Sequence, residues 1–179
     1  MRRIAVLCLL AVSLLGGAVT PVRAAVTPQN RGLQGVHTVR VVVEDLSPAV
    51  QKAGLRKGHL QAIAEKQLKD SGITVLPARE PGKVPVVYIR LSSVVAGEEA
   101  RAPLSFYLNV QVKQLAVLAQ GQPLTCQGAP APSHPPLLVS TWERGTMVML
   151  DRAELFFYVQ SVLTNLLSDL LEDYRGANG

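Results

Sequence analysis

Cysteine and aromatic residues are scarce in this sequence, and each scarcity excludes a class of protein. Only two of the 179 residues are cysteine, Cys8 and Cys126, and Cys8 lies in an apolar N-terminal stretch. Without that stretch the chain cannot form an internal disulfide, so packing alone must stabilise the fold. Tryptophan occurs once and aromatic residues make up 4% of the chain, which excludes a stacking platform for single-stranded nucleic acid.

The N-terminal residues have the three-part layout of a secretory signal peptide. A basic start at 1–3 precedes the apolar stretch Ile4 to Val19, and small residues at Val22 and Ala24 predict cleavage after Ala24. The stretch is short for a bilayer span, which needs about 20 apolar residues. No small residue precedes Cys8, as lipidation of a cysteine would require. We therefore expect a periplasmic or secreted protein that is not an integral membrane protein after cleavage.

The positive charge of the chain belongs largely to that signal. The full sequence has 18 Lys and Arg against 13 Asp and Glu, and three of the arginines lie within residues 1–24. The mature chain therefore has 15 basic and 13 acidic residues, a net charge of +2. So small an excess gives no support for a nucleic-acid partner.

Motifs that carry catalysis or hold metals are also missing. The three histidines are His37, His59 and His134, and no pair has the HxxxH or HExxH spacing of a zinc site. The sequence contains no GxSxG, phosphate-binding loop or GxGxxG pattern. Glu143 and Arg144 are adjacent in an expected strand, where an ordinary cross-strand ion pair accounts for their charges. We predict no catalytic residue, no metal, no cofactor and no enzymatic activity.

Alternating apolar residues predict most of the elements as strands. Strands are expected over 37–45, 73–76, 84–95, 104–119 and 137–150, with Gly145 marking a bulge in the last. Residues 120–136 carry five prolines and no periodicity, which is typical of a loop. The segment 55–72 has helical spacing of its apolar residues, with Gly72 placed as a C-terminal cap.

The C-terminal segment 151–175 predicts an amphipathic helix rather than a membrane span. Its leucines and valines recur at steps of three and four, while polar residues fill the other side. Asp151 and Glu154 have the spacing of a capping box, and Gly176 is expected to end the helix. These leucines and valines form one apolar side of the helix, the Leu stripe, which should cover one face of the predicted sheet.

The order β-α-β-β-β-β-α predicts an α+β fold, a two-layer sandwich in which two helices pack on one face of a mostly antiparallel sheet. We divide the chain into a signal peptide (1–24), a flexible leader (25–36) and a single α+β domain (37–176).

Three stretches carry a resemblance to known proteins: "VRVVVEDL" (39–46), "GLRKGHLQAIAEKQLKDSGITVL" (54–76) and "DLLEDYR" (169–175). With them the chain resembles a set of small uncharacterised exported bacterial proteins. Its topology is similar to periplasmic domains such as the N-terminal domain of the TolB translocation protein and the lipopolysaccharide-assembly lipoprotein LptE. The resemblance implies work in the Gram-negative envelope without catalysis. The chain lacks the lipidation cysteine of LptE, and no functional residue is carried over.

Candidate binding residues come from two places. The strand 104–119 should turn Tyr107, Asn109, Gln111 and Lys113 towards solvent, where they form a candidate recognition surface, although a plain solvated sheet face has the same pattern. Cys126, in the Pro-rich loop, is a candidate partner contact or the link of a dimer, and an inert exposed connector is the simpler interpretation.

These observations favour a non-catalytic periplasmic protein that binds a protein or lipid component of the envelope, as an assembly or transport accessory. The alternative is a carrier that holds a hydrophobic small molecule or lipid between helix and sheet. A hydrolase with a site assembled from distant residues is the third hypothesis. The sequence leaves the partner, ligand and pathway open.

The Cys126 hypothesis has a direct test. If the thiol links two chains, non-reducing electrophoresis of the purified protein shows a dimer band that Cys126→Ser abolishes. A monomer for both proteins would retire the disulfide-linked dimer.

Overall fold

The computed structural model describes residues 30–77, 83–95, 104–116 and 136–179. The predicted signal peptide, the first part of the leader, His134 and Cys126 lie outside these ranges, so the structure does not test the predictions made for them.

Five strands form one mixed sheet with the order β2-β1-β3-β4-β5. β1 pairs in parallel with β2 and β3, and the longer β3–β4 and β4–β5 pairings are antiparallel. The strands are β1 (Thr38–Val43), β2 (Thr74–Leu76), β3 (Val86–Val95), β4 (Leu104–Ala116) and β5 (Leu137–Leu150).

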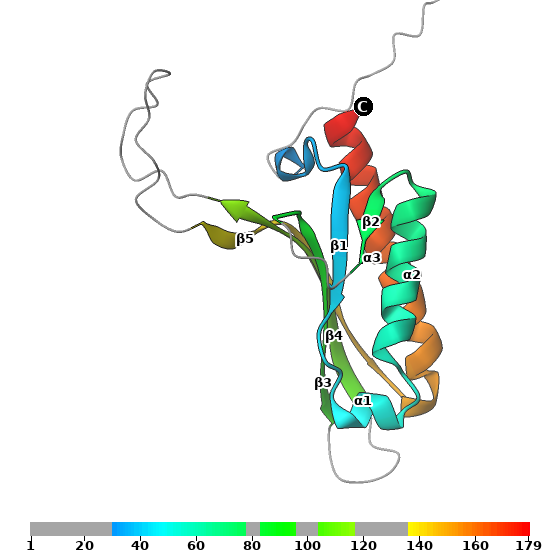
Figure 1. Ribbon diagram of the computed structural model, residues 1–179. Coiled ribbons are helices and arrows are strands. Elements are labelled where there is room, and N and C mark those ends of the chain that lie inside the picture. Colours follow the sequence, from blue (N-terminus) through cyan, green and yellow to red (C-terminus); the bar gives the residue numbers. More distant parts are fainter. Residues whose placement is uncertain (1–29, 78–82, 96–103, 117–135) are drawn as a thin grey trace, which may run out of the picture.

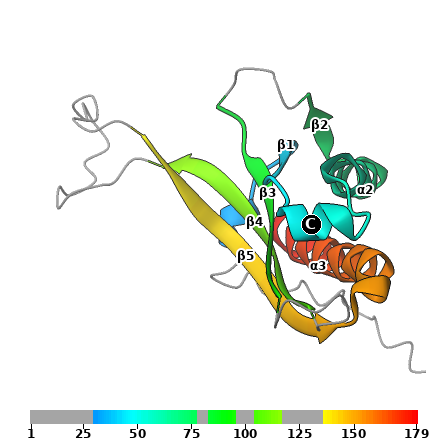
Figure 2. The ribbon, with the colours of Figure 1, turned by 90° about the horizontal axis from the view of Figure 1, so that it is seen from below.

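The two long helices pack on the same face of this sheet (Figures 1 and 2). They are α2 (Lys57–Asp70) and α3 (Leu155–Asn178). The predicted α+β sandwich is confirmed. A short helix, α1 (Pro48–Lys52), follows β1 and was not predicted from the sequence. Ser47 caps α1, accepting a hydrogen bond from the amide of Val50, and Pro48 occupies the first turn, where a missing N–H costs nothing.

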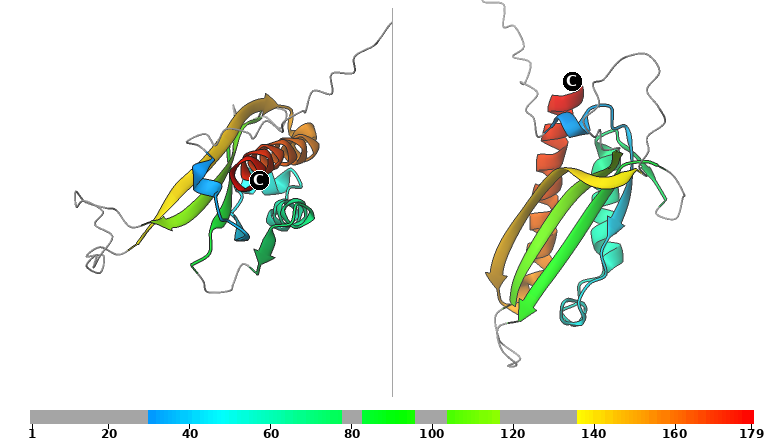
Figure 3. Two further views of the ribbon diagram at one scale, coloured as in Figure 1. Left: turned by 90° about the horizontal axis from the view of Figure 1, so that it is seen from above. Right: turned by 90° about the vertical axis from the view of Figure 1, so that its left-hand side faces the viewer.

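Strand alternation determines which sheet face the helices cover. Ile89 of β3 and Leu108 and Val110 of β4 point towards the helices and have no exposed surface. The intervening residues point to the other face, which no helix covers among the described residues; we call it the open face. It is turned to the viewer in the right-hand view of Figure 3, with the helices behind the strands.

The Leu stripe of α3 forms the opposite wall of the core, as predicted. Its buried side chains recur every three or four residues and are Leu155, Val159, Leu163, Leu166, Leu167, Leu170, Leu171 and Ala177. No helix in the described ranges is both long enough and apolar enough to cross a bilayer.

Both predicted ends of α3 are wrong. Residues 152–154 form a 3-10 turn and Glu154 makes no side-chain cap bond, so the capping box is absent. The helix also continues through Gly176 to Asn178, because tertiary contacts support its last turn. The Asn178 side chain accepts from the amide of Gly35 (2.8 Å) and donates to the carbonyl of Leu33 (3.0 Å).

Those contacts also show where folded structure begins. Residues 25–36 were predicted as a flexible leader, but Arg31–Leu33 form a 3-10 helix and Leu33 and Val36 lie in the core. The described part of this segment, residues 30–36, packs by single side chains against α3 and β5, which no periodic pattern reveals. The described packing thus starts before the predicted boundary at residue 37.

The bulge in β5 lies at Thr141 instead of at Gly145. Val112 pairs with Trp142 and Lys113 with Ser140, which leaves Thr141 as the extra residue. Thr141 Oγ1 donates to the carbonyl of Val112 and accepts from the Gln114 amide, so the side chains fix the irregularity. Gly145 pairs regularly with Asn109.

The packing of α3 on the sheet predicts a large asymmetry between neighbouring helix positions. Leu167→Ala removes a fully buried side chain and should lower the free energy of unfolding by about 2–5 kcal/mol. Asn165→Ala, two residues away on the exposed side, should change it by less than about 0.5 kcal/mol. Urea denaturation followed by circular dichroism measures both; equal effects would contradict the assigned faces.

Candidate binding site

The four predicted recognition residues of β4 all lie on the open face. Tyr107, Asn109, Gln111 and Lys113 alternate with side chains that are buried under the helices. In the sheet register Gln111 lies between Tyr88 of β3 and Glu143 of β5, so polar residues of three strands meet in one row. The shared face is thus as predicted, while the binding role stays a prediction.

Asn109 differs from the expectation of a solvated side chain, because only 1% of it is exposed. Its Nδ2 donates to Glu143 Oε1 (2.9 Å), Tyr107 Oη (3.1 Å) and the Arg144 carbonyl (3.4 Å). Its Oδ1 is buried and has no hydrogen-bond partner among the described residues. A buried amide held by several acceptors has one orientation, so the centre of the open face is preorganised.

Tyr107 covers Asn109 by lying across Gly145 on the neighbouring strand. A Cβ atom at Gly145 would lie 2.5 Å from Tyr107 Oη and 2.7 Å from Cζ. The absent side chain therefore makes room for the aromatic ring, which explains a glycine in the middle of a strand. Tyr107 itself is 37% exposed and available for contact.

A second cluster lies nearer β1 and was not found from the sequence. Lys113 Nζ lies 3.7 Å from the centre of the Tyr88 ring, within cation–π range. Arg90 Nε lies 3.2 Å from Glu44 Oε2. Partial burial, and then the charge of Glu44, raise the pKa of the Tyr88 hydroxyl above its ordinary value. Alternation along β3 places Tyr88 on the face away from the buried Val87 and Ile89. The sequence could therefore have assigned Tyr88 to the open face.

One end of the open face is apolar. Val94, Ser105 and Met149 form one cross-strand row, and Ser92, Tyr107 and Met147 form the next. Val94 is 69% exposed, Met147 74% and Met149 68%. The open face thus joins a polar, hydrogen-bonded centre to an uncovered apolar end beside the β5 edge.

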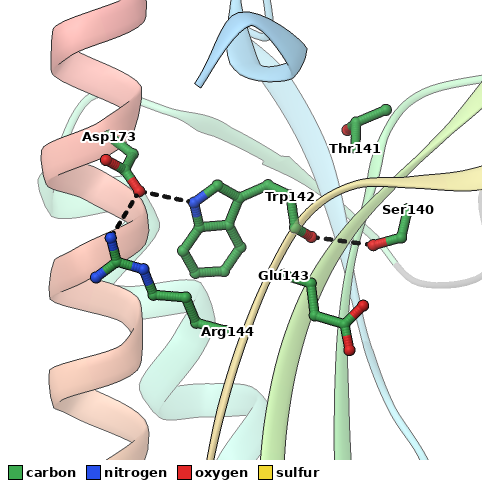
Figure 4. A pocket seen from close by; sticks show the side chains of 6 residues that line it. All are labelled: Ser140, Thr141, Trp142, Glu143, Arg144 and Asp173. Carbon is green, nitrogen blue, oxygen red and sulfur yellow. Dashed lines mark hydrogen bonds and ion pairs between the residues drawn. The ribbon is translucent and has the colours of Figure 1, made fainter. Parts of the chain in front are cut away.

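Behind the open face, ion pairs tie β5 to α3 (Figure 4). Trp142 Nε1 donates to Asp173 Oδ2 (2.9 Å), and the Arg144 guanidinium reaches Asp173 (3.3 Å) and Asp169 (2.9 Å). The hydrogen bond to Asp169, with the negative charge of Asp173, raises the pKa of Arg144 further above its ordinary value, although burial opposes this. Arg144 therefore pairs with α3 and Glu143 accepts from Asn109, so the cross-strand ion pair predicted for these charges is not formed among the described residues.

An open depression of about 380 Å³ lies along this junction, lined by Ser140, Thr141, Trp142, Glu143, Arg144 and Asp173. The Trp142 indole N–H and the Arg144 guanidinium are already engaged by helix carboxylates. These contacts attach the edge strand to the helix layer, and that is the role we assign to them.

The described histidines do not come together. His37 Nδ1 lies 3.4 Å from the Tyr174 hydroxyl, and the ring of His59 in α2 lies 5.6 Å from that of Phe156 in a tilted arrangement. Within the described ranges, no group of three or more His, Cys, Asp or Glu side chains is arranged to hold a metal ion.

Comparisons with known proteins give a distant structural likeness. No family model matches the sequence, and no curated protein matches it. Among solved structures, a minor lipoprotein from Acinetobacter baumannii aligns over 79% of this chain and 92% of its own, with 9% identity and a TM-score of 0.35. A likeness of this degree assigns no function and no residue. The resemblance drawn from the sequence stays a prediction.

The contact between Tyr107 and Gly145 predicts coupled mutations. Gly145→Ala should lower the free energy of unfolding by about 1–3 kcal/mol, because the new methyl group overlaps the tyrosine ring. In a Tyr107→Ala background the same change should cost little, which a double-mutant cycle of thermal unfolding measures. Gly58→Ala, where a Cβ meets nothing within 4 Å, is the control and should not destabilise. A Gly145→Ala cost that persists without the tyrosine would contradict the contact.

Proposed function

We propose that the protein is a non-catalytic binding module of the bacterial envelope and that its open face recognises a protein component of that envelope. One observation carries the proposal: one face of the five-stranded sheet is uncovered among the described residues, and around the buried Asn109 it presents Tyr88, Tyr107, Gln111 and Lys113 in adjacent rows. The predicted signal peptide supports the location outside the cytoplasm.

The physical character of the open face suits a macromolecular partner. Tyrosine and methionine are enriched in protein interfaces, and this face offers Tyr107, Met147 and Met149 at its surface. The buried Asn109 network already fixes Tyr107 and Glu143, so less side-chain entropy is lost when a partner binds. Small-molecule sites, in contrast, are usually concave and enclose most of the ligand.

The alternative of a lipid carrier needs space between the helices and the sheet. At that interface Ile89, Leu163 and Leu167 have no exposed surface and belong to one continuous core. One depression lies at the outer junction of β5 with α3 and another at the start of α3, and both are open to solvent. No observation favours the carrier over the binding module. The hydrolase hypothesis needs converging catalytic side chains, and of the described histidines His37 lies just before β1 and His59 in α2.

Charge reversal on the two sides of the molecule tests the proposal. Lys113→Glu places a negative charge on the open face and removes the contact with Tyr88. Lys66→Glu makes the same change on the exposed side of α2, where the lysine side chain is 77% exposed. The partner is first captured from a detergent-solubilised envelope extract of the source bacterium and then purified. Lys113→Glu should weaken its binding by at least about tenfold, and Lys66→Glu should leave it unchanged.

Two results contradict the proposal. Equal binding by both variants would place recognition away from the open face. Turnover of a substrate that Lys113→Glu abolishes in a folded protein would show a reaction site there instead. Titration calorimetry with the purified partner gives the affinities, and circular dichroism confirms that each variant is folded.

A further inference from the structure

The two edges of the sheet are protected very differently. β2 has three residues, and a short edge strand offers few free backbone groups to another chain. β5 is the opposite edge and has fourteen residues. Its segment Glu143–Met149 contains no proline or lysine, the residues that natural proteins use to block edge pairing. This long edge is an open template for another strand.

Side chains of the segment Glu143–Met149 could also make apolar contacts with a second strand. Met147 and Met149 are mostly exposed on the open face. The two charged residues already have partners in their own chain: Arg144 pairs with Asp169 and Asp173, and Glu143 accepts from Asn109. A second strand therefore meets methionines and already paired charges.

The segment is self-complementary when it is reversed about Thr146. An antiparallel copy related by a two-fold axis perpendicular to the sheet places Thr146 opposite Thr146 of the second copy. Gly145 then faces Met147 of the second copy, and Glu143 faces Met149 of the second copy. Each pair lies on one face of the sheet, as antiparallel geometry requires. Paired threonines are favourable across strands, and the glycine leaves room for the methionine.

Two other registers are less favourable because of charge. A two-fold axis at Glu143 or at Arg144 sets two like charges directly opposite, which is destabilising. At the bulge, Thr141 is in close contact with Gly32 of the N-terminal 3-10 helix, so the regular edge ends there. The register about Thr146 uses the regular part of the edge and opposes no like charges.

We propose that β5 is a dimerisation edge: two copies of this chain pair antiparallel along Glu143–Met149. The pairing is isologous, spans about 23 Å at 3.3 Å per residue, and joins the two sheets into one of ten strands. Because the axis is perpendicular to the sheet, both open faces lie on the same side and both helix layers on the other. The dimer needs no disulfide and does not depend on the recognition role proposed above.

A pair of opposite charges at one position tests the register. The protein carries Cys126→Ser and is kept under reducing conditions, so that a disulfide cannot contribute. Met149→Glu sets a carboxylate opposite Glu143 of the second copy and should weaken the dimer at least about tenfold, or 1.4 kcal/mol. Met149→Lys, at the same exposed position, sets a cation opposite that glutamate and should leave the dimer unchanged or tighter. Sedimentation equilibrium measures both.

Val94→Glu is the matched control. Val94 lies in the same cross-strand row as Met149 and is equally exposed, but on β3, inside the sheet. It should leave the dimer intact, and similar thermal unfolding of the three variants shows that each is folded. A wild-type monomer at about 100 µM, which implies a dimer weaker than about 5 kcal/mol, overturns the proposal. So does equal dissociation by Met149→Glu and Met149→Lys, or by Met149→Glu and Val94→Glu.

Discussion

The burial of one sheet face under the Leu stripe of α3 is the constraint on which the rest of the structure depends. Leu163 and Leu167 of α3 and Ile89 and Leu108 of the sheet are all removed from water, and apolar burial of this kind is the dominant stabilising term in a fold without a disulfide. Both long helices pack on that one face. The other face of the sheet is therefore left uncovered, and the polar side chains at its centre stabilise one another by hydrogen bonds.

β5 depends on this arrangement because it has a neighbouring strand on one side only. Its alternate residues serve both layers: Trp142 and Arg144 point back to carboxylates of α3, while Glu143 points forward to Asn109. Ion pairs at exposed positions contribute little each, but here two donors share Asp173 with Asp169 beside it. α3 thus anchors the edge strand on the helix side. The free backbone groups of β5 and its side chains on the open face stay accessible to a partner.

The sequence predicts the features that depend on periodicity and fails on those that depend on single contacts. Strands and helices were found because alternation and three- to four-residue spacing follow directly from which face is buried. The ends of α3 were wrong because Asn178 and Leu33, distant in sequence, stabilise its last turn. The bulge at Thr141 is fixed by hydrogen bonds to Val112 and Gln114, and no local pattern encodes them. The face of Tyr107 was predictable, but the burial of Asn109 beneath it required the neighbouring strand.

We infer that the contact between the helices and the sheet serves packing alone and encloses no ligand. The protein then acts through its outer surfaces. Native mass spectrometry of the protein, purified gently from the envelope, tests this claim most directly, because a ligand enclosed in the fold survives into the gas phase with it. We expect every mass to be a sum of polypeptide chains, with no bound small molecule. A reproducible adduct of lipid size would contradict it, because such a molecule would have to lie where α3 and the sheet are in contact.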